Sequence, residues 1–402
     1  MTQRKMERRR FIQTGLVGMA GLPVLANGDN TTEKTTTGKK PKEPITRVLG
    51  KTGIRLPVVS MGVMNADNPN LVRAALDSGI VHLDTAHYYQ RGRNEEMIGE
   101  VIKGRPRDSF VIATKVPGMP MDRQTGLFTA ETSGDALLEK FAISLKRLGL
   151  EYVEILYLHN VWKREATLFE PLILALQKAK KSGQARFIGV STHQNEAEVI
   201  HAAVDSKVYD VVLTAYNFRE DHYPETKKAI ARAAAAGLGI VAMKPLAGLY
   251  WDEEKTRPIN TKAALKWVLE DPNVHTAIPG MTAFEHLNED LEVMTDITMT
   301  AEEKAALIAP PELAGFYCQH CGQCLAQCPH NMPIPSLMRG YMYAHAYRNY
   351  AAAQDLVLSL EVPADSCGQC EPCAVRCAKG FAVKERIRNI VQIQNVAAAW
   401  FA

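Results

Sequence analysis

Short apolar runs alternate with amphipathic stretches along most of the chain. The apolar runs are rich in Val, Ile and Leu, and each precedes a stretch whose apolar positions recur at helical spacing. The eight runs are residues 58–63, 81–86, 110–116, 152–160, 185–192, 209–217, 238–246 and 274–281. Continuous apolar strands are typical of a parallel sheet that is buried on both faces, so eight strand–helix units predict a (β/α)8 TIM barrel of the α/β class.

The regions on either side of this alternation predict further parts of the chain. Residues 45–57, ITRVLGKTGIRLP, have Lys-Thr-Gly at their centre and predict a hairpin across the bottom of the barrel. Residues 27–44 are rich in Thr, Lys, Gly and Pro without an apolar period, which indicates a flexible linker. The alternation then stops, so we expect the barrel to occupy 45–298. A small α+β or helical domain, with a helical stretch at 336–360, is expected over 299–402.

Residues 1–26 resemble a twin-arginine (Tat) export signal. Arg8 and Arg9 precede a Gly-rich apolar run, and Val24-Leu25-Ala26 is a small-residue cleavage site. Such signals export folded proteins, so the mature protein is expected in the periplasm or cell envelope. The run is too short and too Gly-rich to predict a transmembrane span. A disordered basic tail and an uncleaved anchor are the alternatives.

The overall charge is nearly balanced. The 47 basic and 44 acidic residues give a formal net charge of +3. After the N-terminus the basic residues cluster only in a short linker run at Lys39, Lys40 and Lys42. Because nucleic-acid binding depends on a concentrated positive surface, nucleic acid is not an expected partner.

Polar side chains occur at the ends of several predicted strands, where barrel enzymes place their chemistry. Asp84, Lys115 and His159 end the second, third and fourth strands, and Tyr89 lies in the loop after Asp84. A Lys–Asp pair is expected because either charge alone is costly to bury. We expect the cation to lower the pKa of Tyr89, so that the phenol exchanges a proton with a carbonyl or alcohol oxygen that His159 orients. A purely structural ion pair is the alternative.

These residues and their surroundings resemble the aldo/keto reductase family. The segments LDTAHYY, NEEMIG, ATKV and LYLHN match its Asp, Tyr, Lys and His tetrad in type, order and approximate spacing. The resemblance covers residues 45–298 and implies NAD(P)H-dependent hydride transfer at the barrel mouth, without a Rossmann fold. The sequence agrees on the last point. Its nearest glycine-rich match, Gly237-Leu-Gly239, lies before a strand and not between a strand and a helix.

The resemblance also implies cofactor contacts from the later strand ends. The positions concerned are Ser191, Asn217, Met243, Lys244, Gly280, Met281, His286, Glu289 and Asp290. Met243 stands where well-studied members have an aromatic residue that stacks on the nicotinamide. Gly280, Met281 and His286 replace the Lys-Ser pair and the Arg that hold the 2′-phosphate of NADP, so NAD and NADP both remain candidates. Glu289 and Asp290 keep the acidic/amide pair that contacts adenine in the family.

All eight cysteines lie in two runs of the form C-x2-C-x2-C-x3-C, a spacing typical of [4Fe–4S] ligation. The tail resembles a bacterial two-cluster ferredoxin module with a lengthened insert. In such modules the last cysteine of each run ligates the other cluster. The implied ligand sets are Cys318, Cys321, Cys324 and Cys377 for one cluster and Cys367, Cys370, Cys373 and Cys328 for the other. Ala378 replaces the usual Pro. Structural zinc, with His320 or His330 nearby, and a disulfide scaffold are the alternatives.

Two functions of different classes follow from these features. The first is an exported oxidoreductase that interconverts a carbonyl and an alcohol, with a sugar among the candidate substrates, and whose clusters relay electrons to a redox partner protein. The second is an electron-transfer protein whose barrel is a docking module without nucleotide chemistry. Clusters that only brace the tail are a third possibility. A flavin is the usual adaptor between two-electron and one-electron chemistry, but no flavin motif is present. The complete tetrad favours the first function.

Overall fold

The computed structural model describes residues 43–122, 125–308, 315–368 and 370–401. Residues 1–42, which contain the predicted export signal and nearly all of the predicted linker, lie outside the described residues. Glu43–Ala402 form one compact unit. No helix among the described residues is long and apolar enough to span a membrane.

Eight parallel strands form a closed barrel, as the sequence predicts. Each strand pairs with its neighbours in chain order. The strands are β3 (Met61–Gly62), β4 (His82–Asp84), β5 (Val111–Val116), β6 (Val153–Leu158), β7 (Ala185–Thr192), β8 (Val211–Ala215), β9 (Gly239–Met243) and β10 (Thr276–Ile278). Hydrogen bonds from Ser60 N to Ala277 O (2.8 Å) and from Ala277 N to Val58 O (2.9 Å) join the last strand region to the first.

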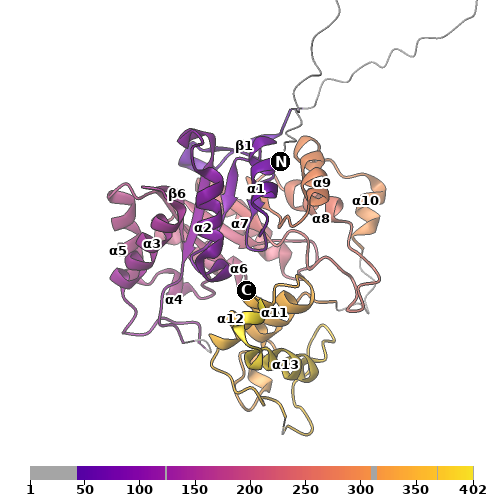
Figure 1. The fold of residues 1–402 in the computed structure, drawn as a ribbon. Coiled ribbons are helices and arrows are strands. Elements are labelled where there is room, and N and C mark those ends of the chain that lie inside the picture. The colour runs from indigo at the N-terminus through magenta and orange to yellow at the C-terminus, as the bar shows by residue number, and fades with distance from the viewer. Residues whose placement is uncertain (1–42, 123–124, 309–314, 369, 402) are drawn as a thin grey trace, which may run out of the picture. The chain divides into compact units, whose positions relative to one another are not determined.

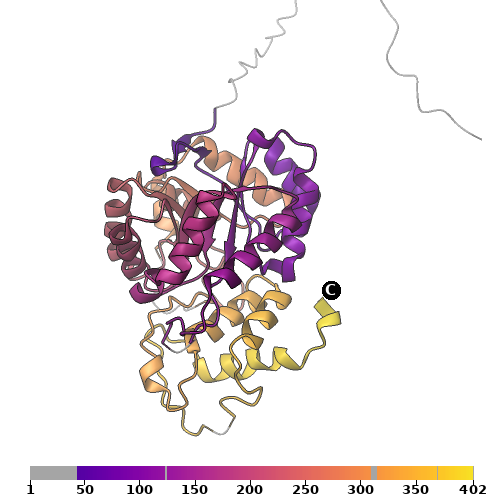
Figure 2. The same cartoon turned by 90° about the vertical axis from the view of Figure 1, so that its left-hand side faces the viewer.

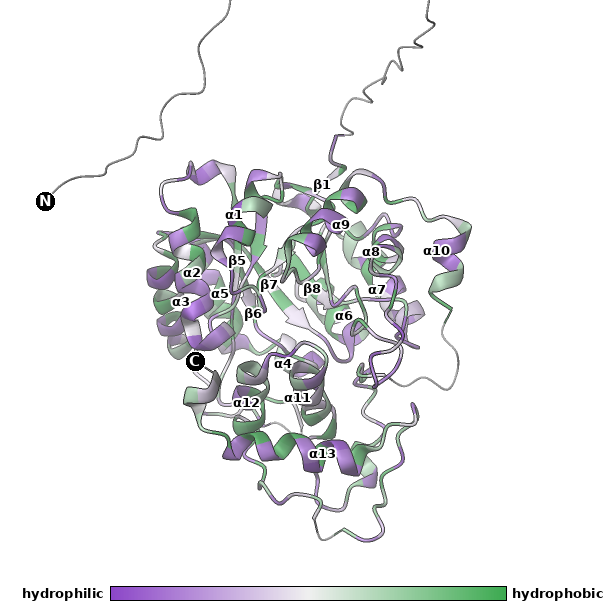
Figure 3. Ribbon diagram, turned by 45° about the vertical axis from the view of Figure 1, so that its right-hand side comes forward, coloured by the Kyte–Doolittle hydropathy of each residue, from purple (hydrophilic) through white to green (hydrophobic). Residues whose placement is uncertain are grey.

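Helices cover the outside of the strands (Figure 1). They are α1 (Pro69–Asp77), α2 (Arg93–Ile102), α3 (Gly134–Leu148), α4 (Arg164–Thr167), α5 (Glu170–Lys181), α6 (Glu196–Ser206), α7 (Tyr223–Ala235), α8 (Thr261–Leu269) and α9 (Phe284–Thr295). Alternate strand residues serve two cores because side chains alternate across a strand. In β6, Ile155 and Tyr157 pack inside the barrel, whereas Leu156 and Leu158 pack against the helices. The inner strands are correspondingly apolar (Figure 3).

A hairpin closes the bottom of the barrel, as predicted. β1 (Thr46–Val48) and β2 (Arg55–Pro57) are antiparallel, and the chain between them turns at Gly53, whose φ of 74° favours glycine. Leu49 and Leu56 are completely buried in the cluster that fills the barrel interior. The hairpin therefore plugs the end of the barrel opposite the strand C-termini.

The described residues of the tail form helices joined by irregular segments and no strand, so the α+β form considered from the sequence is not seen there. Its helices are α10 (Ala301–Ala306), α11 (Ile334–His345), α12 (Tyr350–Leu358) and α13 (Val383–Val391), and the last three pack together (Figure 2). The helical stretch predicted at 336–360 is present as two helices, α11 and α12. Arg348 has a φ of 54°, which interrupts the helix, and the Asn349 side chain then caps α12 by accepting from Ala352 N (2.9 Å).

The tail is bound to the barrel loops by buried polar contacts. The Tyr317 hydroxyl donates to Glu220, and Asn217 Nδ2 donates to the same hydroxyl oxygen (3.0 Å). On α13, Arg386 is 5% exposed, pairs with Glu253 of the loop after β9, and donates to Gly315 O (2.9 Å). A buried guanidinium is costly unless it keeps such partners, so these contacts fix how the tail docks.

We expect Arg386→Met to lower the free energy of unfolding by about 1–3 kcal/mol, because the pair with Glu253 and the bond to Gly315 are lost. Arg388→Met is the matched control, since Arg388 is exposed on the same helix and its loss should change stability by less than about 0.5 kcal/mol. Thermal unfolding of the anaerobically purified protein measures both. Equal midpoints for the two variants would contradict this account of docking.

Candidate active site

A cavity of about 460 Å³ opens at the C-terminal ends of the barrel strands. This is the face where barrel enzymes carry their chemistry. Barrel residues form most of its wall, but the corner between α11 and α12 forms part of it. The tail residues in the lining are Tyr343, Ala346, Tyr347 and Arg348. The cavity is therefore shared between the barrel and the tail.

Three of the four predicted tetrad residues form one hydrogen-bonded chain. Asp84 ends β4 and Lys115 lies near the end of the neighbouring β5, and each is 1% exposed. Lys115 Nζ donates to an oxygen of Asp84, to Thr85 O (2.6 Å) and to the Tyr89 hydroxyl oxygen (3.2 Å). Asp84 and Tyr89 also line the cavity. The parallel pairing of β4 with β5 thus places the ammonium group of Lys115 within hydrogen-bond distance of the Tyr89 phenol.

The fourth tetrad residue, His159, follows β6 directly. Its backbone N–H donates to Val116 O (2.9 Å), which continues the pairing of β6 with β5. The imidazole and the Tyr89 ring lie 6.3 Å apart between centroids, at 82°. The structure therefore brings together all four residues that the sequence singled out.

The expected direction of the Tyr89 pKa shift is wrong for this structure. Burial raises the pKa of Tyr89, and the Lys115 cation opposes that rise without overcoming it. Burial also raises the pKa of Asp84, against the charge of Lys115. Burial alone would lower the pKa of Lys115, but Asp84 and Tyr89 raise this pKa by more than burial lowers it. The ammonium form is therefore favoured. Tyr89 is consequently a protonated phenol beside a fixed cation.

The predicted cofactor residues divide into two groups. Met243, Lys244, Gly280, His286, Glu289 and Asp290 all line the cavity. Three others do not. Ser191 is buried and accepts from Asn160 N (2.9 Å), and Met281 is completely buried in the core. The Nδ2 group of Asn217 donates hydrogen bonds to Tyr317 and Glu220 within the protein.

Sequence reasoning missed several residues of the cavity wall, including His193, Tyr250, Lys255, Tyr343 and Arg348. His193 follows β7 by one residue, so the strand-end rule could have found it. No pattern in the sequence marks Tyr343 or Arg348. Their place in the wall depends on how the tail docks.

The tail cysteines form no disulfide among the described residues, and most of their electrostatic interactions fall into two sets. Burial raises the pKa of Cys318 to about 12, and the thiols of Cys324, Cys377 and Cys321 contribute in the same direction. Burial likewise raises the pKa of Cys367, with contributions from the thiols of the second set. Those thiols belong to Cys370, Cys328 and Cys373. Cys377, the last cysteine of the second run, therefore interacts with Cys318 and Cys324 of the first run, and Cys328 interacts with Cys367 of the second.

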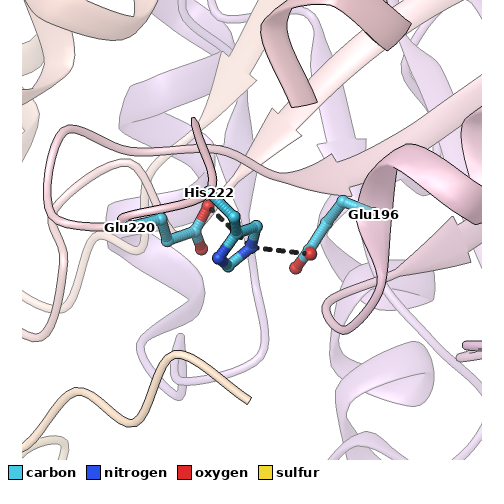
Figure 4. A group of neighbouring side chains, drawn as sticks. All are labelled: Glu196, Glu220 and His222. Carbon is cyan, nitrogen blue, oxygen red and sulfur yellow. Dashed lines mark hydrogen bonds and ion pairs between the residues drawn. The ribbon is translucent and has the colours of Figure 1, made fainter. Parts of the chain in front are cut away.

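A largely buried acid–imidazole group lies at the start of α6 and in the loop after β8 (Figure 4). His222 Nε2 is 3.0 Å from an oxygen of Glu196 and 3.9 Å from an oxygen of Glu220, and both carboxylates are almost completely buried. Their ligand atoms lie within 4.8 Å of one another, close enough to hold a metal ion. Burial lowers the pKa of His222, but Glu196 and then Glu220 raise it to about 8, so a proton already serves as the counter-charge.

This group predicts a loss of stability as pH rises. The folded-state pKa of His222 is about 8 and its ordinary value is 6.5, so its contribution is complete below pH 6.5 and is lost as pH rises through 8. We expect the free energy of unfolding to fall by about 1–2 kcal/mol over this interval. In Glu196→Gln the fall should be smaller, whereas the control Glu198→Gln, exposed on the same helix, should behave as the unsubstituted protein. Urea unfolding between pH 6 and 9 measures the free energy of unfolding of each protein. The same change of this free energy with pH in all three proteins would refute the prediction.

Comparison with known proteins gives a consistent result. A sequence profile of the aldo/keto reductase family matches residues 60–263. The L-glyceraldehyde 3-phosphate reductase of Escherichia coli O157:H7 is 27% identical over 322 residues, covering 65% of this chain and 90% of that protein. L-Galactose dehydrogenase of Arabidopsis thaliana is 25% identical over 300 residues, covering 65% and 91%. The holo form of an aldo-keto reductase from Bacillus halodurans, at 23% identity and a TM-score of 0.54, covers 66% of this chain and 95% of its own and shares the barrel fold.

The matched region contains most of the cavity's barrel wall and all four residues Asp84, Tyr89, Lys115 and His159. The named relatives are reductases and dehydrogenases, and the family uses a nicotinamide cofactor. On its sequence match, its barrel and these four side chains, this chain belongs to the aldo/keto reductase family and is an oxidoreductase.

Proposed function

We propose that the chain is an exported iron–sulfur oxidoreductase that interconverts a carbonyl and an alcohol and relays electrons through two [4Fe–4S] clusters to a partner protein. The observation that carries the enzymatic part is the hydrogen-bonded chain from Asp84 through Lys115 to Tyr89, which ends at the wall of the cavity. The cysteine sets of the tail support the clusters. The Arg8-Arg9 signal supports export.

The side chains of the site account for the movement of the proton. A nicotinamide cofactor, when bound, would supply the hydride for the carbonyl carbon. Tyr89, which burial keeps protonated, gives its hydroxyl proton to the carbonyl oxygen as the C=O double bond becomes C–O. Lys115 stabilises the phenolate that remains, and Asp84 holds Lys115 charged and in place. Solvent then restores the proton of Tyr89.

The cavity fits a nicotinamide nucleotide. Its volume lies within the usual ~300–1,000 Å³ range for cofactor sites. Met243 and Lys244 would lie against the nicotinamide end. Burial and the neighbouring Glu289 raise the pKa of Asp290 well above its ordinary value, so its carboxyl group can donate as well as accept a hydrogen bond. Such a carboxyl group suits the edge of an adenine at the far end of the cavity, which carries both hydrogen-bond donors and acceptors. The positively charged residues at the rim of the cavity would determine the choice between NAD and NADP.

The cysteine geometry favours iron–sulfur clusters over zinc. Four thiolates around one zinc ion at ~2.3 Å must lie roughly 4 Å from one another. Among the described residues no three cysteine sulfurs lie within 4.8 Å of one another. The thiols within each set still influence one another's pKa, which suits a larger inorganic core held by the same four residues. Such clusters would supply one-electron chemistry.

Named relatives support a sugar or a phosphorylated aldehyde as the substrate. One relative is an L-galactose dehydrogenase and another is an L-glyceraldehyde 3-phosphate reductase. Tyr250, Tyr343 and Tyr347 line the cavity and offer hydroxyl groups and ring faces to a polyol.

A second function, an electron carrier whose barrel is only a docking module, has two observations in its favour. Asn217, an expected cofactor contact, is bonded within the protein, and Met243 replaces the usual stacking aromatic residue. This alternative predicts clusters that cycle normally and no nucleotide-dependent turnover.

We expect Tyr89→Phe to lower carbonyl reduction at least about 100-fold, because the proton donor is lost. The control is Tyr88→Phe at the adjacent residue, whose ring is 51% exposed, and it should retain normal activity. In the unsubstituted protein, alcohol oxidation should rise with pH because it requires the Tyr89 phenolate, whereas reduction should fall only at alkaline pH. Anaerobic steady-state assays in both directions measure this. Full activity in Tyr89→Phe would contradict the assignment of Tyr89 as the proton donor of the tetrad.

Cys321→Ser should remove one of the two clusters, lowering iron, sulfide and absorbance near 400 nm by about half. Electron delivery to an external dye should fall with it, because the relay loses a centre. Gln323→Ser, an exposed neighbour outside the ligand sets, should leave both quantities unchanged. If Cys321→Ser lowers only the thermal midpoint while dye reduction continues at the normal rate, the clusters merely brace the tail.

A further inference from the structure

The cavity wall carries cations that have no acidic partner within the part of the chain that the structure describes. Its acidic residues are otherwise occupied. Asp84 is paired with Lys115, and Glu289 accepts from Thr261 Oγ1 (2.8 Å). Asp290 has a raised pKa because it is buried beside Glu289. The remaining charged groups in the wall are Lys244, Lys255 and Arg348, with His286 close by.

Lys244 is the inner cation of this set. Its Nζ atom is buried and has no hydrogen-bond partner among the described residues. Burial, and then the charge of Arg339, lower the pKa of Lys244 to about 7, against smaller opposing contributions that begin with Glu220. A buried ammonium without a bonded partner is costly, so a ligand that brings an anion into the cavity would relieve it.

Lys255 and Arg348 are the outer cations, and they come from different parts of the chain. Lys255 lies in the loop after β9, and Arg348 lies at the corner between α11 and α12 of the tail. Neither forms an ion pair with any described residue. They are close enough to repel, since burial and then the charge of Arg348 lower the pKa of Lys255. Two like charges held together at a cavity rim are a favourable site for an anion between them.

All three cations also share a backbone feature. Lys244, Lys255 and Arg348 have φ values of 55°, 59° and 54°, a left-handed conformation that costs free energy for residues other than glycine. Each of the three side chains therefore reaches the cavity wall from a residue whose unfavourable backbone conformation is held by its surroundings.

We propose that Lys255 of the barrel and Arg348 of the tail, with Lys244 behind them, form a composite binding site for the phosphate groups of the ligand that occupies the cavity. The inference rests on the proposed function for the presence of such a ligand, and adds that the tail is part of its binding site.

The phosphate can come from two sources that share this chemistry. One is the pyrophosphate of the dinucleotide cofactor, and the other is a phosphorylated carbonyl substrate. Adenosine diphosphate ribose carries the pyrophosphate but no nicotinamide, and glyceraldehyde 3-phosphate carries only a substrate phosphate. Titration of each probe by isothermal calorimetry into the full-length protein, with its clusters retained and any bound nucleotide removed, therefore separates the two sources.

Arg348→Gln and Lys255→Gln are the test variants, and Arg348→Lys keeps the charge. We expect each neutral variant to raise the Kd of the cognate probe roughly fivefold to tenfold at low salt, with less effect at high salt. Arg348→Lys should recover most of the affinity. Arg388→Gln is the control, because this exposed arginine of α13 does not line the cavity and should bind as the unsubstituted protein does.

Weakened binding of adenosine diphosphate ribose assigns the site to the cofactor, and weakened binding of glyceraldehyde 3-phosphate alone assigns it to the substrate. Both outcomes support the composite site. If both probes bind the neutral variants as tightly as the unsubstituted protein, or bind neither protein, the proposal is overturned. Neither probe is turned over through Tyr89 in this binding experiment, so failure of the tetrad assignment would be recognised separately.

Discussion

The buried pair of Lys115 and Asp84 is the interaction on which the site depends. Both side chains are 1% exposed, and neither charge could remain there without the other. The pair exists because β4 and β5 are parallel neighbours and end at the same rim of the barrel. It leaves one ammonium proton directed at Tyr89, so the fold itself determines where a proton can be transferred. Burial of the phenol then favours its neutral, proton-donating form.

The tail packs against the barrel loops and forms part of the cavity wall. Tyr317, which directly precedes Cys318, is bonded to Glu220 and Asn217 of the loop after β8. Further along, the corner between α11 and α12 contributes Tyr343 and Arg348 to the cavity wall. The same docking contacts therefore bring the first cysteine run close to the barrel mouth and narrow the cavity. In the proposed function, substrate chemistry and one-electron chemistry meet at this junction.

The sequence was sufficient for the barrel, the hairpin and the tetrad, because each depends on local periodicity or on the rule that parallel strands end together. It was insufficient where distant segments meet. Ser191, Asn217 and Met281 occupy the expected strand ends, yet their side chains are used for internal bonds or packing. Arg348 reaches the cavity only because Asn349 starts a new helix and turns the chain. The pKa of Tyr89 depends on the balance of burial and charge, which spacing alone does not reveal.

The most direct test of the account is to identify what the protein contains when it is purified without oxygen from the envelope fraction. Mass spectrometry of acid-released small molecules would be combined with iron and sulfide determination on the same sample. The account predicts a nicotinamide dinucleotide together with about eight iron and eight sulfide per chain. Iron and sulfide without any organic cofactor would move the function to the electron carrier, and a flavin would contradict the assignment of the cavity.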